Sequence, residues 1–385
     1  MLRSRGARWP PARYLASRRL VDASRTAFAL VVAAAVAIGI LLYAGTLSTT
    51  VDATGEAKAR VFTGAKTAAT LRSNVTKPPR TPFPSTVVRS IERAVAGDGT
   101  GGIDVMGIDR RTFAATAFWD KSFASGSLSE ILRLLASGPP GAAVPIVVTG
   151  APDLPQETTL TVPASGISPI SIKVVARAVA FPGMRAGSPL IVMDREALRS
   201  RSEIGLEVVW SNAPRAEVLA AMRRDGLEVV RSVTTADVKG TSQFLSLSWT
   251  FGFLQALGIL TGFVALGGAV MYLEARQRSR EVSYALARRM GLARRAHRRS
   301  IAMELGAILL MSSTIGGTLA WIAARLVYRK LDPIPSVPPA PLFRLPVLLS
   351  GVSLAVVLFA SWLGARRVQR AADHARVAEV MRLAG

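Results

Sequence analysis

The sequence predicts an α-helical membrane protein with four transmembrane helices and a mixed α/β extracytoplasmic domain between the first and second helices. Four uncharged runs carry the first part of this prediction, because a helix of about 20 apolar residues is enough to cross a bilayer. They cover residues 27–47, 249–273, 305–324 and 346–365. The 48–246 segment carries the second part, since strand-like and helix-like patterns alternate along it.

The distribution of arginine predicts how the chain is oriented. Cytoplasmic flanks of transmembrane helices are enriched in Lys and Arg. Residues 1–26 hold seven arginines against one acid, and residues 274–300 hold nine arginines. The 48–246 segment is close to balanced, with 23 basic and 18 acidic residues. We therefore expect a multi-pass protein of the cell membrane with cytoplasmic N- and C-termini, although the short 325–345 loop, basic apart from Asp332, weakly favours the reverse.

The net charge of +23 would also suit a nucleic-acid binder, since phosphate contacts need Lys and Arg. A soluble nucleic-acid binder has no use for uncharged runs of this length, so we expect membrane lipid and not nucleic acid as the partner of this charge. The 27–47 run is longer than the apolar core of a signal peptide and predicts a retained anchor. The chain has no cysteine, so the outer domain must be held together by its core alone.

The outer domain begins with a helix that continues out of the membrane over residues 49–69, followed by a proline-rich break at 76–84. Apolar positions recur every three or four residues in "STVVRSIERAVAG", which predicts a short helix closed by Gly97. Further helices are predicted around 127–136 and in 212–226, the latter with Pro214 in its first turn. Residues 101–113 predict a strand and a turn, and segments rich in Val and Ile predict strands at 143–150, 157–164, 168–181, 189–194, 205–211 and 227–233. A division of this domain into two subdomains remains open.

Small residues recur along two of the predicted membrane helices. In the third run Ser312, Gly316, Ala320 and Ala324 are four residues apart, and in the second run so are Gly258 and Gly262. Such stripes let helix backbones approach closely, which drives association where lipid offers no hydrophobic force. The alternative is that small residues are frequent in any alanine-rich chain.

The sequence gives little indication of a catalytic site. The two histidines, His297 and His374, both fall on the predicted cytoplasmic side, so the outer domain has neither His nor Cys for a triad or a zinc site. The chain has no phosphate-binding loop of the G-x-x-x-x-G-K-[ST] type. We interpret Asp104 and Asp109 as ordinary solvated acids and His297 as a solvated or headgroup-facing residue. The chain is therefore expected not to be an enzyme and to bind no metal or cofactor.

Residues 280–291 predict a short amphipathic helix between the second and third spans. Its residues at helical spacing, its charges and its glycine stop are Arg280, Glu281, Val282, Ala285, Leu286, Arg289, Met290 and Gly291. Two interpretations remain open: a helix resting on anionic headgroups, or a docking helix whose apolar face enters a groove on a cytoplasmic partner.

The segment "EARQRSREVSYALARRMGLARRAHRRSIAMELGAILL" resembles the FtsX-like ABC-transporter permease family in its Arg280-Glu281 pair, its 288–291 segment and Glu304. The tail "HARVAEVMR" is similar to the close of that family. One span, a large outer domain and then three spans give a MacB-like layout, and the outer domain looks like those of actinobacterial members. Arg289 and Met290 depart from the alanine and leucine usual in the family.

This resemblance implies a permease subunit with a cytoplasmic segment at 1–26, a first helix at 27–47, an outer domain at 48–246 and a permease domain at 247–385. It implies that the 280–291 helix couples to a separate cytoplasmic ABC ATPase, which would bind the ATP. With one four-span unit, the chain would pair with itself or with a second permease. The alternative is a non-transport scaffold whose outer domain binds and regulates an extracytoplasmic cell-wall hydrolase.

Overall fold

The computed structural model describes residues 24–374, apart from residues 73, 76–77, 98–99, 137–141, 152, 163–168, 203 and 276–292. Contacts divide the described residues into two compact units. The membrane unit lies within Met1–Thr50, Leu247–Lys330 and Phe343–Gly385, and the sheet unit lies within Val51–Ser246 and Leu331–Leu342. The second segment of the sheet unit is unexpected, because it connects two membrane helices. We call residues 331–342 the connector.

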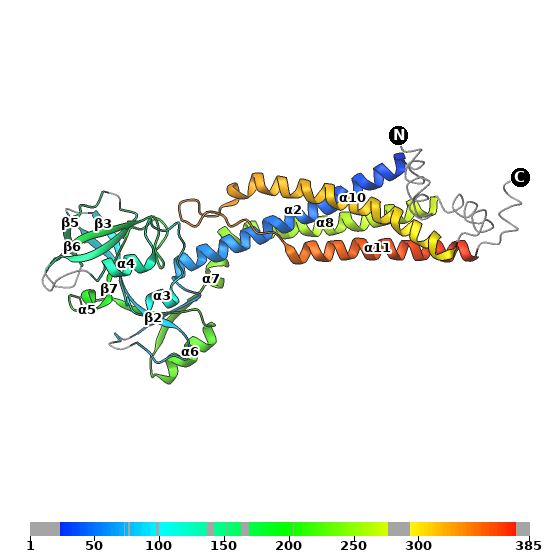
Figure 1. Ribbon diagram of the computed structural model, residues 1–385. Helices are drawn as coiled ribbons and strands as arrows, with labels where there is room; N and C mark the ends of the chain where they lie inside the picture. Colours follow the sequence, from blue (N-terminus) through cyan, green and yellow to red (C-terminus); the bar gives the residue numbers. More distant parts are fainter. Residues whose placement is uncertain are drawn as a thin grey trace, which may run out of the picture. The chain divides into compact units, whose positions relative to one another are not determined.

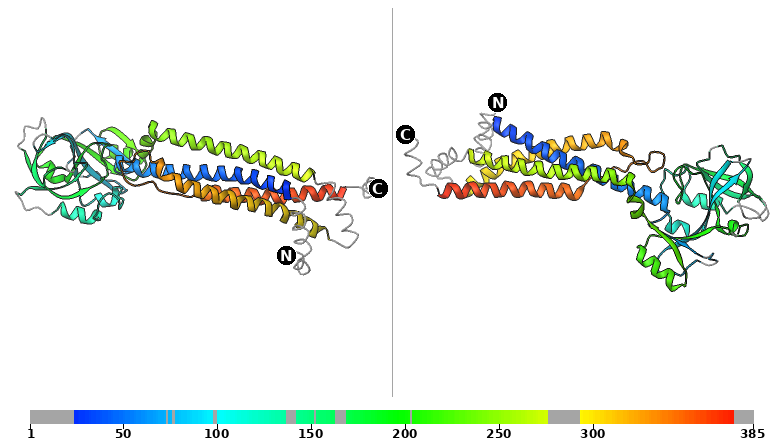
Figure 2. Two further views of the ribbon diagram at one scale, coloured as in Figure 1. Left: turned by 90° about the horizontal axis from the view of Figure 1, so that it is seen from above. Right: turned by 180° about the vertical axis from the view of Figure 1, so that it is seen from behind.

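Four long helices with the length and composition of membrane spans run side by side in the described part of the membrane unit (Figures 1 and 2). They are α2 (Ser24–Thr63), α8 (Ser242–Ala275), α10 (Arg294–Val327) and α11 (Val347–His374). Each contains one of the four uncharged runs, apart from Pro346, which directly precedes α11. All four extend beyond their run, because polar residues outside the hydrocarbon can continue a helix whose backbone hydrogen bonds are already made. A core that includes Leu30, Ile301, Leu305 and Ile308 packs these helices together.

The sheet unit holds a mixed nine-stranded sheet among its described residues. Its strands are β1 (Thr67–Leu71), β2 (Ser85–Ala96), β3 (Thr100–Ile108), β4 (Val144–Thr149), β5 (Glu157–Thr161), β6 (Ile170–Ala178), β7 (Leu190–Asp194), β8 (Leu206–Ser211) and β9 (Val229–Thr234). The predicted strands are confirmed, but the helix predicted over 49–69 ends at Thr63 and its last residues belong to β1. The strand order is β3-β7-β4-β6-β5-β2-β8-β1-β9, and β3 also pairs with β2. The pairings from β2 through β3, β7, β4, β6 and β5 therefore return to β2, so the sheet is one body and not two separate subdomains.

The helix predicted for "STVVRSIERAVAG" is wrong, because these residues form strand β2. The ladder between β2 and β3 shifts register at Ile91/Ala94 and again at Ala94/Val95. Arg93 between them adopts a positive φ of 59°. A bulge inserts an extra residue and shifts the side-chain alternation. The buried positions of β2 therefore recur at helix-like spacings although the backbone is extended.

Strand β2, with its bulge, pairs with three neighbouring strands. Its first half, from Ser85 to Ser90, pairs with β8, and its last two residues pair with β5. Apolar side chains from the ring of pairings form one core that includes Ile103, Ile146, Ile172 and Ile191. A second core packs Phe113, Phe123, Phe181 and Trp210 together with the end of α2. These cores explain how the sheet unit is stable without disulfides.

Short helices border the strands: α3 (Phe113–Thr116), α4 (Leu128–Leu134), α5 (Arg195–Arg199), α6 (Arg215–Arg224) and α7 (Thr235–Lys239). Two of them were expected, α4 and α6, and Pro214 is the N-cap of α6 instead of a first-turn residue. A capping box between Thr234 and Asp237 begins α7. Hydrogen bonds from the Thr234 backbone and side chain, together with Arg215, hold the pKa of the Asp237 carboxyl below its usual value.

Two arginines and one glutamate form a buried ionic triad in the sheet unit. Glu207 on β8 accepts from Arg89 Nη1 at 3.0 Å through one oxygen and from Arg195 Nε at 3.1 Å through the other. Arg89 also donates to the carbonyl oxygens of Ser202 at 3.0 Å and Ile204 at 3.2 Å. The side chain of Glu207 is fully buried. Because its partners satisfy both carboxylate oxygens, the triad can remain charged inside the protein.

Candidate functional site

The connector is fastened to α2 by a buried lysine. Lys58 lies on α2 and its side chain is 0% exposed, while that of Asp332 is 9% exposed. The ammonium donates to Asp332 Oδ1 at 2.5 Å, to the carbonyl of Ile334 at 2.5 Å and to the carbonyl of Val337 at 2.7 Å. A lysine ammonium has three donors. The connector therefore supplies every acceptor that this buried charge needs.

Other side chains of α2 also form hydrogen bonds with the chain between α10 and α11. Thr54, one turn before Lys58, accepts from the backbone of Leu342 at 3.0 Å. The side chain of Val337 is 3% exposed and belongs to the aromatic core of the sheet unit. Within the membrane unit, Thr50 accepts from the backbone of Arg344 at 3.1 Å. We call the contacts of Lys58 and Thr54 with the connector the connector clamp.

The clamp was not predicted from the sequence, although a pattern indicates it. Leu47, Val51, Thr54, Lys58 and Val61 repeat at intervals of three and four residues, and all five are buried. Such spacing places them on one face of a helix. A lysine within an otherwise apolar or small face is a candidate for a buried, paired charge. Asp332 is the acid of the 325–345 loop, but no local pattern in the sequence links it to a residue so far away.

The small residues of the third span lie at a close helix contact. Ser312, Gly316, Ala320 and Ala324 are all buried. A Cβ added to Gly316 would overlap the carbonyl oxygen of Ala35 on α2, and one added to Gly39 would lie 3.3 Å from the Gly316 oxygen. Gly39 was not singled out from the sequence. The backbones of α2 and α10 therefore approach each other at Gly39 and Gly316.

The two glycines of the second span differ from each other. A Cβ on Gly258 would lie 2.9 Å from the Cα of Leu41 on α2, whereas one on Gly262 would meet no described atom within 4 Å. The close approach of α8 to α2 at Gly258 is therefore not repeated at Gly262, one turn later. Gly262 lines a cavity instead.

A buried polar cluster lies near the ends of α8 and α10 that border the basic loop. Tyr272 donates to Glu304 Oε1 at 2.9 Å, and both are buried. His297 and Ser300, at 0% exposure, lie on the same face of α10 as Glu304. The prediction that His297 is solvated is therefore wrong. The arginines around it are exposed, while position 297 falls on the repeating buried face of the helix.

The predicted coupling helix lies outside the described residues. This applies to Arg280, Glu281, Val282, Ala285, Leu286, Arg289, Met290 and Gly291. The described chain stops at Ala275, where α8 ends, and resumes just before Arg294, where α10 begins. The proposal that residues 280–291 dock on a partner therefore rests on their sequence pattern.

The acids considered from the sequence do not form a carboxylate pair. Asp104 is 6% exposed, and Arg185 donates to its two oxygens at 2.7 and 2.6 Å. Its interpretation as a solvated acid is therefore wrong. Asp109 accepts from the backbone of Arg111 at 3.0 Å. Among the described residues, no group of three His, Cys, Asp or Glu side chains could hold a metal ion.

Comparison with known protein families identifies one domain in this chain. Residues 252–371 match the FtsX-like permease C-terminal domain. The matched segment begins in α8 and ends in α11, and it includes the basic loop, Glu304 and the connector. No curated protein matches the chain. The chain therefore contains an FtsX-like permease C-terminal domain, and its four helices long and apolar enough to cross a membrane, with an α/β sheet domain between the first two, give the layout expected of an FtsX-like ABC-transporter permease.

Proposed function

We propose that this chain is the membrane subunit of an ABC system in which a separate cytoplasmic ATPase drives export, extraction or mechanical transmission at the sheet unit. The FtsX-like domain at residues 252–371 carries the proposal, because it assigns an ABC-transporter permease-type role. Such permeases are generally not enzymes. In this proposal the ATPase binds the ATP and this chain holds no cofactor.

The arginine distribution supports an orientation for this arrangement. With four spans, the basic loop and both termini lie on one side of the membrane, and the sheet unit and connector lie on the other. The side with the basic loop is the cytoplasmic one under the positive-inside rule. The proposed docking helix, residues 280–291, then faces the compartment that contains ATP.

The connector clamp supports a transmission role. The connector is the covalent link between α10 and α11, yet its contacts place it in the sheet unit. A displacement of α10 or α11 therefore reaches the sheet unit through a segment that is held by a buried charge and not by a loose loop. Leaving Asp332 and the two carbonyls without the ammonium costs about 2–3 kcal/mol, so small forces will not detach the connector.

The proposed assembly also contains a second permease subunit. The chain carries one four-span unit, and we expect it to pair with a second copy of itself or with another permease chain. The same ATPase assembly would then contact two basic loops.

The test is recovery of the partner chains from native membranes. The tagged full-length protein is extracted in mild detergent, and the co-purified chains are identified by mass spectrometry. We expect an ATPase with a phosphate-binding loop, and we expect Leu286→Asp to lose it because a charge enters the predicted apolar face. Tyr284→Asp is the matched control, since helical spacing places it on the opposite side of the same helix.

Three outcomes are informative. Loss of the ATPase with Leu286→Asp but not with Tyr284→Asp supports the docking helix. Equal loss with both variants contradicts the assignment of the face. Folded protein that brings down a cell-wall hydrolase and no ATPase contradicts the proposal and favours the scaffold function.

A further inference from the structure

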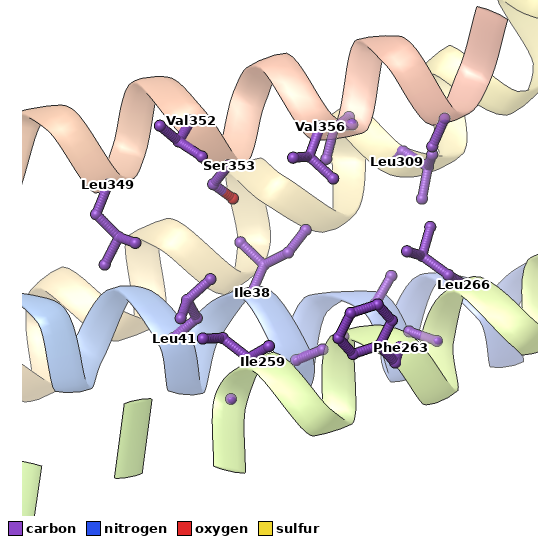
Figure 3. A pocket seen from close by; sticks show the side chains of 17 residues that line it. Ile38, Leu41, Ile259, Phe263, Leu266, Leu309, Leu349, Val352, Ser353 and Val356 are labelled. Atoms are coloured by element: carbon purple, nitrogen blue, oxygen red, sulfur yellow. The ribbon is translucent and has the colours of Figure 1, made fainter. Parts of the chain in front are cut away.

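The membrane unit contains an apolar cavity between α2, α8 and α11. Its volume is about 320 Å³. Figure 3 shows Ile38 and Leu41 of α2, Ile259 and Phe263 of α8, and Val352 and Val356 of α11 around it. Leu309 of α10 lies at one end. Among the described residues that line the cavity, Ser353 is the one with a polar side chain.

The glycines of α8 explain why the cavity exists. At Gly258, α8 touches the backbone of Leu41, and a Cβ there would lie 2.9 Å from its Cα. One turn later an added Cβ on Gly262 would meet no described atom within 4 Å. On the facing side α2 presents Ala34 and Ala37. Short side chains on both helices therefore leave a space that the neighbouring side chains do not fill.

Water is a poor occupant of this space. A buried water needs two to four polar partners, and apolar cavities in proteins stay dry. A single serine hydroxyl does not meet that need. Protein interiors are otherwise packed as densely as organic crystals. An apolar molecule or chain is therefore the occupant that the lining favours.

The position and shape of the cavity identify that occupant. The lining residues lie inside the uncharged runs, at the depth of the hydrocarbon. They extend from Ala34 to Leu41 on α2 and from Leu349 to Ala360 on α11. At a rise of 1.5 Å per residue these stretches are about 10 and 17 Å long. The space is therefore elongated along the helices.

The cavity is also accessible from the bilayer. Ile259 and Phe263 line it, and they are 51% and 67% exposed on the membrane unit. A helix of a second copy is about 10 Å across with its side chains, which is too wide for a space of this volume and length. We propose that the cavity binds one acyl chain of a membrane lipid, lying along α2, α8 and α11.

This site does not depend on the ATPase. The acyl chain fills the space that Gly262 leaves and connects α8 to α2 and α11 at the level where their side chains do not fill the space between them. Replacing Gly262 by leucine fills the same space from the protein side, because an added side chain meets no described atom near the backbone.

The test uses the full-length protein in nanodiscs of phosphatidylcholine that contain a phospholipid with a photoreactive diazirine in its acyl chain. After irradiation, cross-linked peptides are mapped by mass spectrometry. We expect cross-links at 258–266 and 349–357 to exceed those at the exposed residues Phe253 and Met311, which do not line the cavity. In Gly262→Leu they fall to the level of those exposed residues. Gly252→Leu is the control, since Gly252 also has open space but does not line the cavity.

Ser353→Leu provides a second filling variant from α11, in case Gly262→Leu does not fold. Cross-links spread evenly over the exposed faces, and unchanged in both filling variants, would overturn the proposal. A disulfide between two copies of Ser353→Cys in native membranes would also overturn it, because it would show an interface between copies at this place. The natural chain has no cysteine, so that disulfide has no competitor.

Discussion

The best-defined contacts that join distant segments differ between the two units of this protein. The sheet unit buries charges, as in the triad of Arg89, Glu207 and Arg195 and in the connector clamp at Lys58. The membrane unit brings backbones together at Gly39 and Gly316. The difference follows from the solvent. In water, burial of apolar surface drives folding and can carry the cost of burying a paired charge. In lipid that driving force is missing, and close packing of small residues replaces it.

Within the sheet unit the two buried charge sites also differ. The partners of Glu207 come from within the sheet and its flanking segments. The partners of Lys58 come from the connector between two membrane helices. The triad therefore contributes to the stability of one unit, whereas the clamp attaches to that unit the segment that links two membrane helices.

The largest effect is expected from breaking the triad. Glu207→Ala leaves two buried guanidinium groups without their shared carboxylate and should destabilise the sheet unit by about 3–5 kcal/mol. Hydrogen–deuterium exchange of the full-length protein should show faster exchange across β2 and β8. Glu196→Ala, which removes an exposed ion pair with Arg199, should change exchange little, since such pairs contribute about 0–1 kcal/mol. Equal effects of the two variants would show that the triad does not hold the sheet.

The clamp should give a smaller and more local effect. Lys58→Met keeps the length of the side chain but leaves Asp332 and two carbonyls without the ammonium, at a cost of about 2–3 kcal/mol. We expect faster hydrogen exchange in residues 331–342 while β4 and β7 keep their protection. Lys66→Met, at an exposed lysine, is the control. Loss of protection throughout the sheet would place Lys58 with the triad as a stabiliser of the fold.

The smallest effect is expected at the membrane contact. Gly316→Leu pushes α10 away from the carbonyl of Ala35, and overpacking of this kind costs about 1–3 kcal/mol. The full-length protein in detergent should unfold at a lower temperature than Gly306→Leu, whose added side chain has open space. Identical unfolding temperatures would show that α2 and α10 can separate at this point without loss.

The local pattern of the sequence was sufficient for most of the secondary structure. Uncharged runs identified the four membrane helices, and clusters of Val and Ile identified the strands, because both patterns report which side chains must avoid water. The helix expected at residues 85–97 was wrong because a bulge at Ile91 to Ala94 gave a strand the spacing of a helix. A register shift depends on the partner strand, which the local pattern does not contain.

By itself, the sequence determined the number of membrane helices, the place of the α/β domain and the family resemblance of the 274–310 segment. Only the tertiary structure shows that Lys58 is paired with Asp332 and that His297 is buried. It also shows that Gly258 lies at a close contact between helices, whereas Gly262 lines a cavity. The physical reason is the range of the interactions. Hydrophobicity and helix formation act among neighbours in the chain, whereas a buried charge or an empty space is defined by residues hundreds of positions apart.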